Sequence, residues 1–562
     1  MRLAGLFLLL TAAALQAQTD VVMNAMRDEL ARSMKQLTVE NLEKAYFISY
    51  RIVDSDNVNV AASFGALNHS TVGRSRRLTV EVRVGDPKLD NSHFYSLNMD
   101  AGTRLQIFFG MTSLGLEDDY KELRRQLWLA TDATYKKAVE DLSKKRALSQ
   151  TQSHEDESDD FSREDPGTFN DELPPVKVDI SQWETEARGI SALFRQMPAI
   201  HTSTVMFNCV NTFTRYLTSE GTSYTRRQPN VMYNTEAATQ APDGAPLDDF
   251  VWFHGRSLPE MPSQQELTAR VQAMGKRLTE LRDAPTLTNY SGPVLAEGDA
   301  APQLVRLVFL PNLTGAKPTI SGLPGNVQPN LNLPENPFLD KIGARVLPEF
   351  LSVTDNPAIT EYQAHHLNGF SKMDEDGTRS REVLLVENGI LKTLLTSRDP
   401  VRGVEHSTGS RHAGAAAPSN VIVTVSHGMS NDDLRARFLQ LVKQRNLPFG
   451  ITVRRMNNAT NALLAYKVFP DGHEELVRSV QFVGLTASAF KDIVAASQEP
   501  NFLTVRYQPA RVGLFLPTGG EEDFMPVSLV VPSLLFEDVS VRKNRGLAPH
   551  PPVSGHPFFD KE

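Results

Sequence analysis

Hydrophobic positions along the chain follow the spacing of helices in some segments and that of strands in others. Between residues 22 and 37, and again between 116 and 148, apolar residues recur every three or four positions, which predicts two amphipathic helices. Residues 45–53 and 76–86 are rich in β-branched and aromatic side chains and predict strands. The first half of the chain therefore predicts a mixture of helices and short strands.

An acidic, serine-rich segment, residues 149–175, follows the second of these helices and ends in two prolines. Its apolar content is too low to offset the entropy that ordering it would cost. We expect this segment to be a surface loop or a mobile linker.

The second half of the chain starts after a turn-rich stretch around residues 289–303. An apolar run at 303–310 predicts its first strand, and Asn388-Gly389 lies between two alternating apolar runs, as a type I′ hairpin turn requires. A helix capped by Ser430 is predicted over 431–444. These patterns predict an α+β fold with two lobes, built from mixed, largely antiparallel sheets and flanking helices.

Length and charge narrow the classes of protein that need to be considered. A chain of 562 residues exceeds what one hydrophobic core usually serves, so we expect an N-terminal domain at 18–296 and a C-terminal domain at 297–562. The net charge is −9, and no cluster of lysine and arginine is interleaved with aromatic residues. Such a chain offers little to hold a phosphate backbone, and we predict no nucleic-acid binding.

The N-terminus has the pattern of a secretory signal peptide. Arg2 precedes an apolar run, and Ala17 is a small residue before a polar stretch, so residues 1–17 are interpreted as the signal. No later segment approaches the roughly 20 apolar residues that a transmembrane helix needs. The mature protein is predicted to be soluble and exported, to a periplasm or to the outside of the cell.

Catalytic motifs are scarce in this sequence. It contains no HExxH or HExxxH, no GxSxG and no phosphate-binding loop, and its single cysteine, Cys209, is expected to be a buried residue in a strand. Glu361 and His365 would share one face of a helix, and His406 and His412 lie in a loop rich in glycine and alanine. We interpret these histidines as hydrogen-bonded surface or interface residues; zinc binding by them is the alternative.

A family resemblance adds to this interpretation. The runs IGARVLPEFLSVTDNP (342–357) and GFSKMDEDGTRSREVLLVENGILKTLLTSRDPVRGVEHSTGSRHAG (369–414) resemble the C-terminal half of the TldD/TldE metallopeptidase family, also known as PmbA or modulator of DNA gyrase. The similarity is strongest over residues 342–414. It implies an α+β fold of two lobes and, for active members, zinc-dependent proteolysis.

The family has two kinds of subunit, and the resemblance implies that this chain is of the TldE-like kind. In the TldD-like kind, a helix after the strand equivalent to residues 304–310 carries an HExxxH zinc motif. Here Pro311 and Pro318 argue against a helix, and no histidine occurs between His254 and His365. The family's additional cysteine ligand also has no counterpart, because Cys209 lies in the N-terminal half.

The leading hypothesis is an exported, metal-free family member that acts as a structural or substrate-presenting subunit. It implies a homodimer, or a heterodimer with a metal-bearing member, a peptide as substrate and no cofactor of its own. The residues expected to contact the peptide cleft or the interface are Ser407, Thr408, Gly409, Arg411 and His412, with a purely structural turn as the plain alternative.

Two other hypotheses remain open from the sequence. The first is an active zinc peptidase with ligands outside the family motif, namely Glu361, His365, His406 and His412. The second is a stand-alone peptide-binding or assembly protein of the cell envelope, which needs neither a metal nor a partner protease.

Overall fold

The structure is a computed structural model that describes residues 20–37, 42–95, 111–150, 157–321, 336–507 and 525–544. The predicted signal peptide, residues 1–17, lies outside these ranges. Within them, no helix has both the length and the apolar character that crossing a membrane would demand.

A strongly curved sheet forms the first lobe. Its four long strands are β1 (Ala45–Ser63), β2 (Ala66–Asp86), β7 (Thr202–Thr218) and β8 (Ser223–Gln240). Its short strands are β3 (Leu89–Asp90), β5 (Met111–Ser113), β6 (Thr168–Glu172) and β9 (Pro246–Gly255). The strand order is β3-β2-β1-β7-β8-β6, with β5 beside β2 and β9 beside β8.

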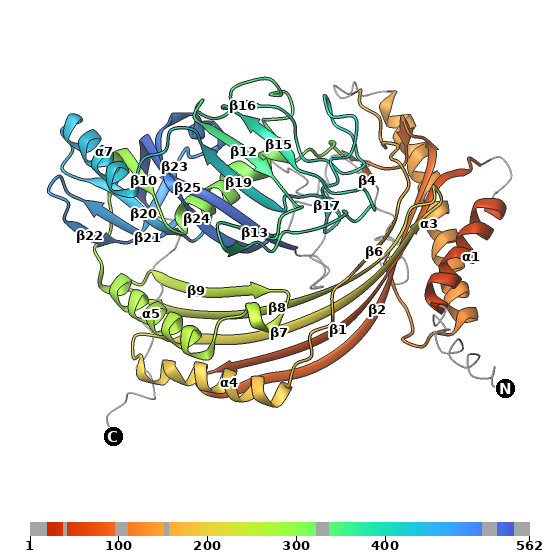
Figure 1. Cartoon of the computed structure of the whole chain (residues 1–562), viewed down its shortest axis with the longest axis horizontal. Coiled ribbons are helices and arrows are strands. Elements are labelled where there is room, and N and C mark those ends of the chain that lie inside the picture. The colour runs from red at the N-terminus through yellow and green to blue at the C-terminus, as the bar shows by residue number, and fades with distance from the viewer. Residues whose placement is uncertain are drawn as a thin grey trace, which may run out of the picture.

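Helices cover the convex face of this sheet, and the second lobe lies against its concave face (Figure 1). The helices are α1 (Val21–Gln36), α3 (Tyr120–Ser149), α4 (Ile180–Ala192) and α5 (Gln264–Asp283). Alternate residues of each strand face one side. Thus Ile48, Tyr50 and Ile52 of β1 pack with α1 and α3 in one core, while Val60 and Ala62 pack with α4 and α5 in another.

The second lobe contains an eleven-stranded sheet of mixed direction. Its strands are β10 (Asn289–Ala296), β12 (Leu351–Asp355), β15 (Val383–Glu387), β16 (Ile390–Leu391), β19 (Asn420–Val425), β20 (Gly450–Met456), β21 (Ala462–Val468), β22 (Glu474–Val477), β23 (Val480–Val483), β24 (Ile493–Tyr507) and β25 (Met525–Lys543). The order is β16-β15-β12-β19-β25-β10-β20-β21-β22, with β23 and β24 beside β25. The β10–β20 and β19–β25 pairs are parallel and the others antiparallel.

Mixed sheets with flanking helices confirm the predicted α+β class. The predicted hairpin at Asn388-Gly389 is also confirmed, because both residues have positive φ, +48° and +78°, as a type I′ turn requires. Helix α7 (Asn431–Gln444) has the predicted Ser430 cap, whose hydroxyl accepts the N–H of Asp433. The chain changes from the first sheet to the second between β9 and β10, before residue 296.

The predicted strand at 303–310 is wrong. These residues belong to a helical segment that runs as α6 (Ala300–Leu304), a π-helical turn (Val305–Phe309) and a 3-10 turn (Leu310–Leu313). Pro302 lies in the first turn, where a missing N–H costs little, and Pro311 lies where the helix tightens into the 3-10 turn. A helix buried on most sides carries an apolar run like that of a strand, so periodicity could not separate the two.

The acidic segment is also more ordered than its composition predicted. Residues 151–156 lie outside the described ranges, but Asp160 and Phe161 are buried, and 168–172 form β6. Asp160 forms ion pairs with Lys145 and Lys317, at 2.5 and 2.8 Å. Lys145 of α3 and Lys317 of the second lobe therefore supply ion-pair partners for this segment, and the prediction of a loop or mobile linker is wrong for the buried residues 160–162 and for β6.

One buried carboxyl in the second lobe gives a pH prediction. Asp355 is fully buried; burial raises its pKa to about 7, against the N–H groups of Ser419 and Asn420 that favour the charged form. The folded pKa exceeds the unfolded one, so the folded protein holds this proton more tightly than the unfolded chain does. The stability that the neutral carboxyl contributes is fully present below about pH 4 and is lost as the pH rises through about 7.

Asp355→Asn should remove this dependence. We expect the variant to match the wild type near pH 4 and to exceed its free energy of unfolding by about 4 kcal/mol at pH 8. Urea denaturation at both pH values measures the difference, with Asp492→Asn at an exposed position as the control. An equal pH slope in Asp355→Asn and the wild type would contradict the assignment.

Candidate functional site

Charged and aromatic side chains line the concave face of the first sheet, where it meets the second lobe. Arg51 lies opposite Tyr216, which in turn lies opposite Tyr224, and directly opposed residues of antiparallel strands point to the same face. Glu81 of β2 also lies on this face, because its neighbours Val80 and Val82 pack against the helices. Arg226 of β8 does so because it is two positions from Tyr224 in the same strand. The two tyrosine rings pack 5.0 Å apart.

The second lobe contributes a turn at 374–377 and a loop at 407–414. The Asp374 carboxylate joins them, since it accepts the backbone N–H groups of Asp376, Thr378 and Arg411. Gly409 has a φ of +74°, and a Cβ built on it would lie 2.4 Å from the carbonyl oxygen of Arg379. Only glycine allows this approach, so the loop and the turn are held in one arrangement.

Glu375 links this loop to the first sheet. Its carboxylate accepts the N–H groups of Ala413 and Gly414 and pairs with Arg51 at 3.0 Å, while Arg51 also donates to the Glu375 carbonyl at 2.8 Å. Burial acts to raise the pKa of Glu375, but Arg51 and His412 outweigh it and lower the pKa to about 2. Glu375 is therefore ionised at neutral pH and connects both lobes.

The neighbouring carboxyls behave differently. Burial, and then the carboxyl of Asp376, raise the pKa of Asp374 to about 8, against its three N–H donors. Burial also raises the pKa of Asp376, although Arg411 lies 3.2 Å from it. Adjacent carboxyls with opposite pKa shifts thus lie on one turn.

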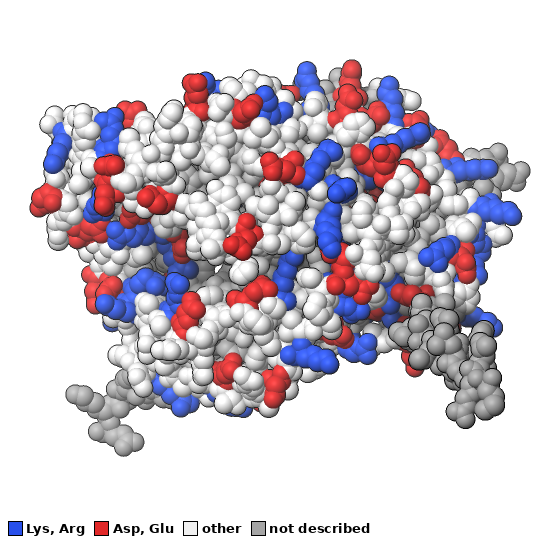
Figure 2. Space-filling model, viewed as in Figure 1, with Lys and Arg blue, Asp and Glu red and all other residues white. Residues whose placement is uncertain are grey.

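Charged side chains of both lobes meet around Arg51, Glu81, Glu375, Asp399 and Arg411, a region that we call the charged chamber. These side chains keep 18–28% of their surface accessible although both lobes surround them. The space-filling view shows a hollow along the boundary between the lobes, with charges of both signs at its rim (Figure 2). Paired charges in a partly enclosed hollow can bind a polar chain such as a peptide.

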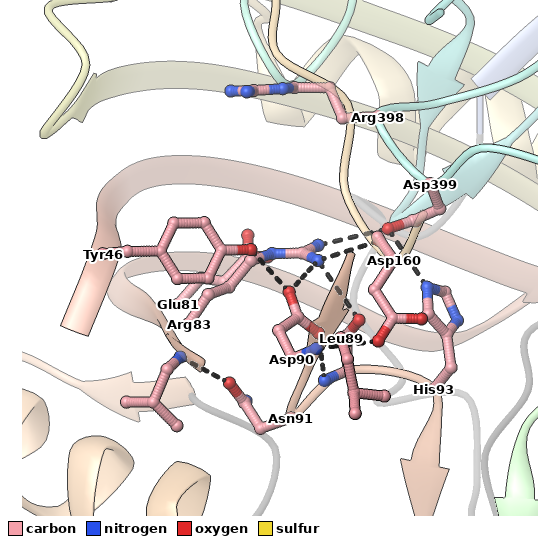
Figure 3. A network of polar contacts seen from close by, with 12 residues as sticks. Tyr46, Glu81, Arg83, Leu89, Asp90, Asn91, His93, Asp160, Arg398 and Asp399 are labelled. Atoms are coloured by element: carbon pink, nitrogen blue, oxygen red, sulfur yellow. Dashed lines mark hydrogen bonds and ion pairs between the residues drawn. The ribbon is translucent and has the colours of Figure 1, made fainter. Parts of the chain in front are cut away.

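A second polar network closes the chamber at the β2 end (Figure 3). Arg83 pairs with Glu81, Asp90 and Asp399, at 2.7, 3.0 and 3.1 Å, and its guanidinium lies 3.8 Å from the centre of the Phe161 ring. Against the effect of burial, hydrogen bonding from His93 and the charge of Arg83 hold the pKa of Asp399 well below its usual range. This network fixes the acidic segment and the second lobe to the edge of the first sheet.

The predicted loop residues divide into two groups. Ser407 and Thr408 lie inside the second lobe: the Ser407 N–H donates to Glu164, and the Thr408 hydroxyl accepts from the Thr396 N–H. Arg411 lines the chamber through its pair with Asp376, and His412 is buried beside Glu375 with no partner for Nε2. The remaining predicted residue, Gly409, permits the close packing described above.

Sequence reasoning missed the residues of the first sheet. Arg51 and Glu81 lie in the predicted strands 45–53 and 76–86, where charged positions alternate with apolar ones, and Arg226 lies in β8. That alternation was a signal of one polar face, but nothing in the sequence indicated that the second lobe would cover this face.

The alternative metal ligands are not brought together. Glu361 and His365 lie on an exposed hairpin of β13 (Glu361–Tyr362) and β14 (His365–His366), not on a helix, because Gln363 and Ala364 take positive φ values in a tight turn. His406 is 70% exposed near Glu164, whereas His412 is buried. Among the residues with described positions, no three His, Cys, Asp or Glu side chains form a group that could hold a metal ion.

Comparisons with known proteins agree with the fold and with the C-terminal resemblance. Residues 327–543 match the model of the PmbA/TldA metallopeptidase C-terminal domain. A metalloprotease of Archaeoglobus fulgidus is 26% identical over 163 residues, a match that covers 27% of this chain and only 36% of that relative.

Two solved structures share the fold over nearly their whole length. TldE from Thermococcus kodakarensis aligns with a TM-score of 0.56 at 12% identity, covering 92% of this chain and 99% of that one. A protein titled as a modulator of a DNA gyrase, from Thermotoga maritima, aligns with a TM-score of 0.56 at 14% identity and the same coverage.

Proposed function

Because residues 327–543 of this chain belong to the PmbA/TldD family, we propose that the protein is an exported, non-catalytic family member that binds peptides and presents them to a metal-bearing partner. The functional assembly is a heterodimer with that partner or a homodimer. The chamber between the lobes is the peptide site, and Arg411 and His412 are the loop residues that reach it.

The main support for this proposal is the amino-acid composition of one helix. In the TldD-like kind, the zinc motif lies on a helix after a strand, and here the segment Ala300–Leu313 is a helix that follows β10. It contains no histidine, cysteine, aspartate or glutamate. Zinc in proteins is held by these side chains, so the residues of this helix do not fit the metal.

The chamber supports peptide binding without catalysis. Its charges are held in pairs between the lobes, as in the Arg51–Glu375 and Arg411–Asp376 pairs. Such pairs can exchange partners with the amide groups and side chains of a bound chain.

The test is the metal content and activity of the mature, tag-free protein. We expect far less than one zinc per chain by elemental analysis, no cleavage of a random hexapeptide pool by the protein alone, and retention of that pool in equilibrium dialysis. Addition of the metal-bearing family member from the same organism should then restore cleavage. Near-stoichiometric zinc together with cleavage by the lone protein would overturn the proposal.

Export has a separate test. N-terminal sequencing of the protein recovered from its native host should begin at Gln18, directly after the predicted signal. Recovery of the chain with its N-terminus intact would contradict export.

A further inference from the structure

The chamber contains a pair of guanidinium groups without carboxylate partners, at the end formed by β8 and β9. From this pair and the histidines beside it, we infer that Arg226 and Arg256 bind a carboxylate of the peptide, together with His254 and His412. The inference rests on the proposed peptide binding and names the group by which a peptide would be held.

The hydrogen bonds from both guanidinium groups to the second lobe all go to backbone carbonyl groups. One terminal nitrogen of Arg226 donates to the carbonyls of Met373 and Asp374, and one of Arg256 donates to the carbonyls of Asn368 and Phe370. A guanidinium has five N–H donors, so each keeps three that these carbonyls do not use. Within the described part of the chain, no carboxylate lies in ion-pair distance of either group.

The nearby carboxylates are engaged elsewhere. Glu375 pairs with Arg51, and Asp171 pairs with Lys372 at 3.1 Å. Glu260 accepts the Ser257 hydroxyl and the backbone N–H of Arg256, not its guanidinium. Arg226 is buried and Arg256 is half-buried, so two partly desolvated cations lack a bound counter-charge, an arrangement that proteins normally avoid.

Two neutral histidines accompany the arginines. Burial, followed by the charge of Arg256, lowers the pKa of His254 to about 3, and burial lowers the pKa of His412 to about 4, so both rings are uncharged at neutral pH. Among the residues that the structure describes, neither ring nitrogen of His254 has a hydrogen-bond partner, and Nε2 of His412 has none. Each neutral imidazole offers one N–H donor and one acceptor.

These groups suit a single carboxylate. Two guanidiniums supply planar N–H pairs that match carboxylate geometry, and an imidazole N–H can donate to the same oxygens. The carboxylate can come from the C-terminus of a peptide or from an aspartate or glutamate side chain. The structure assigns the chemistry, and the experiment separates the two sources.

The test uses the mature protein and random hexapeptides labelled at the N-terminus with an uncharged dye, in three pools: free C-terminal acids, the same pool as C-terminal amides, and C-terminal amides made without aspartate and glutamate. Fluorescence anisotropy measures each affinity. We expect a loss of about tenfold or more on amidation if the C-terminus is the source, or on removal of acidic residues if side chains are.

The matched variants are Arg256→Gln, Arg256→Lys and the control Arg437→Gln, at a partly exposed site on α7. Arg256→Gln should lose about tenfold or more in affinity, Arg256→Lys should recover part of it, and Arg437→Gln should bind as the wild type does. If Arg256→Gln fails to fold, the affinities of the wild type for the three peptide pools still test the carboxylate site.

The outcomes also separate this inference from the proposed function. Equal binding of all three pools by the wild type, or unchanged binding by a folded Arg256→Gln, would overturn the carboxylate site and leave peptide presentation intact. Failure of the wild type to bind any pool would overturn both.

Discussion

Asp160→Ala is expected to lower the free energy of unfolding by about 3–5 kcal/mol, because it leaves two buried lysines without their carboxylate. Asp160 and Lys145 are 2% and 3% exposed, and Lys317 is 11% exposed. Burial lowers the pKa of Lys145, which the Asp160 charge opposes. The pairs join α3 to the acidic segment and, through Lys317, to the second lobe, so the loss should also loosen the contact between the lobes.

Urea denaturation followed by tryptophan fluorescence measures this effect. Asp159→Ala is the matched control, since the adjacent aspartate is exposed and its removal should change stability by less than about 0.5 kcal/mol. Asp160→Asn keeps the shape of the side chain and removes its charge, so a loss close to that of Asp160→Ala would assign the effect to charge. Equal midpoints for Asp160→Ala and Asp159→Ala would show that the buried pairs contribute little.

Gly409→Ala is expected to cost about 3 kcal/mol or more and to abolish peptide binding at the chamber. The substitution combines an unfavourable positive φ with a Cβ only 2.4 Å from the Arg379 carbonyl oxygen, and backbone cannot move aside as a flexible side chain can. The loop would shift, and Arg411 and His412 would move with it.

Gly472→Ala separates the two causes. Gly472 also has a positive φ, +91°, but nothing lies within 4 Å of its Cβ position. It should therefore lose only about 1 kcal/mol, the cost of the φ strain. Thermal unfolding compares the variants, and anisotropy with the free-acid peptide pool follows binding. A Gly409→Ala protein as stable as Gly472→Ala, with binding intact, would contradict the role of this close approach.

Local signals in the sequence were sufficient where neighbouring residues decide the structure. The Asn388-Gly389 hairpin and the helix capped by Ser430 were predicted correctly, because a type I′ turn and an N-cap depend on a few adjacent residues. The alternation of charged and apolar residues in β1 and β2 likewise determined which side chains share a face of the sheet.

The candidate site depended on contacts that local patterns do not encode. The sequence singled out the loop at 407–412, but it did not indicate that Arg51 would pair with Glu375, 324 positions away. The same limit explains the hairpin at 361–366, where Glu361 and His365 have helical spacing but the backbone turns at Gln363 and Ala364.

The sequence by itself determined the α+β class, the resemblance of residues 342–414 to a peptidase family, and the absence of zinc-binding side chains from residues 300–313. Tertiary structure alone decided that these residues are helical, that Asp160 of the acidic segment pairs with Lys145 and Lys317, and that charges from both lobes surround one chamber. The physical reason is burial: an apolar run can be a strand or a helix, and an acidic segment can be loose or packed, until its surroundings supply the partners.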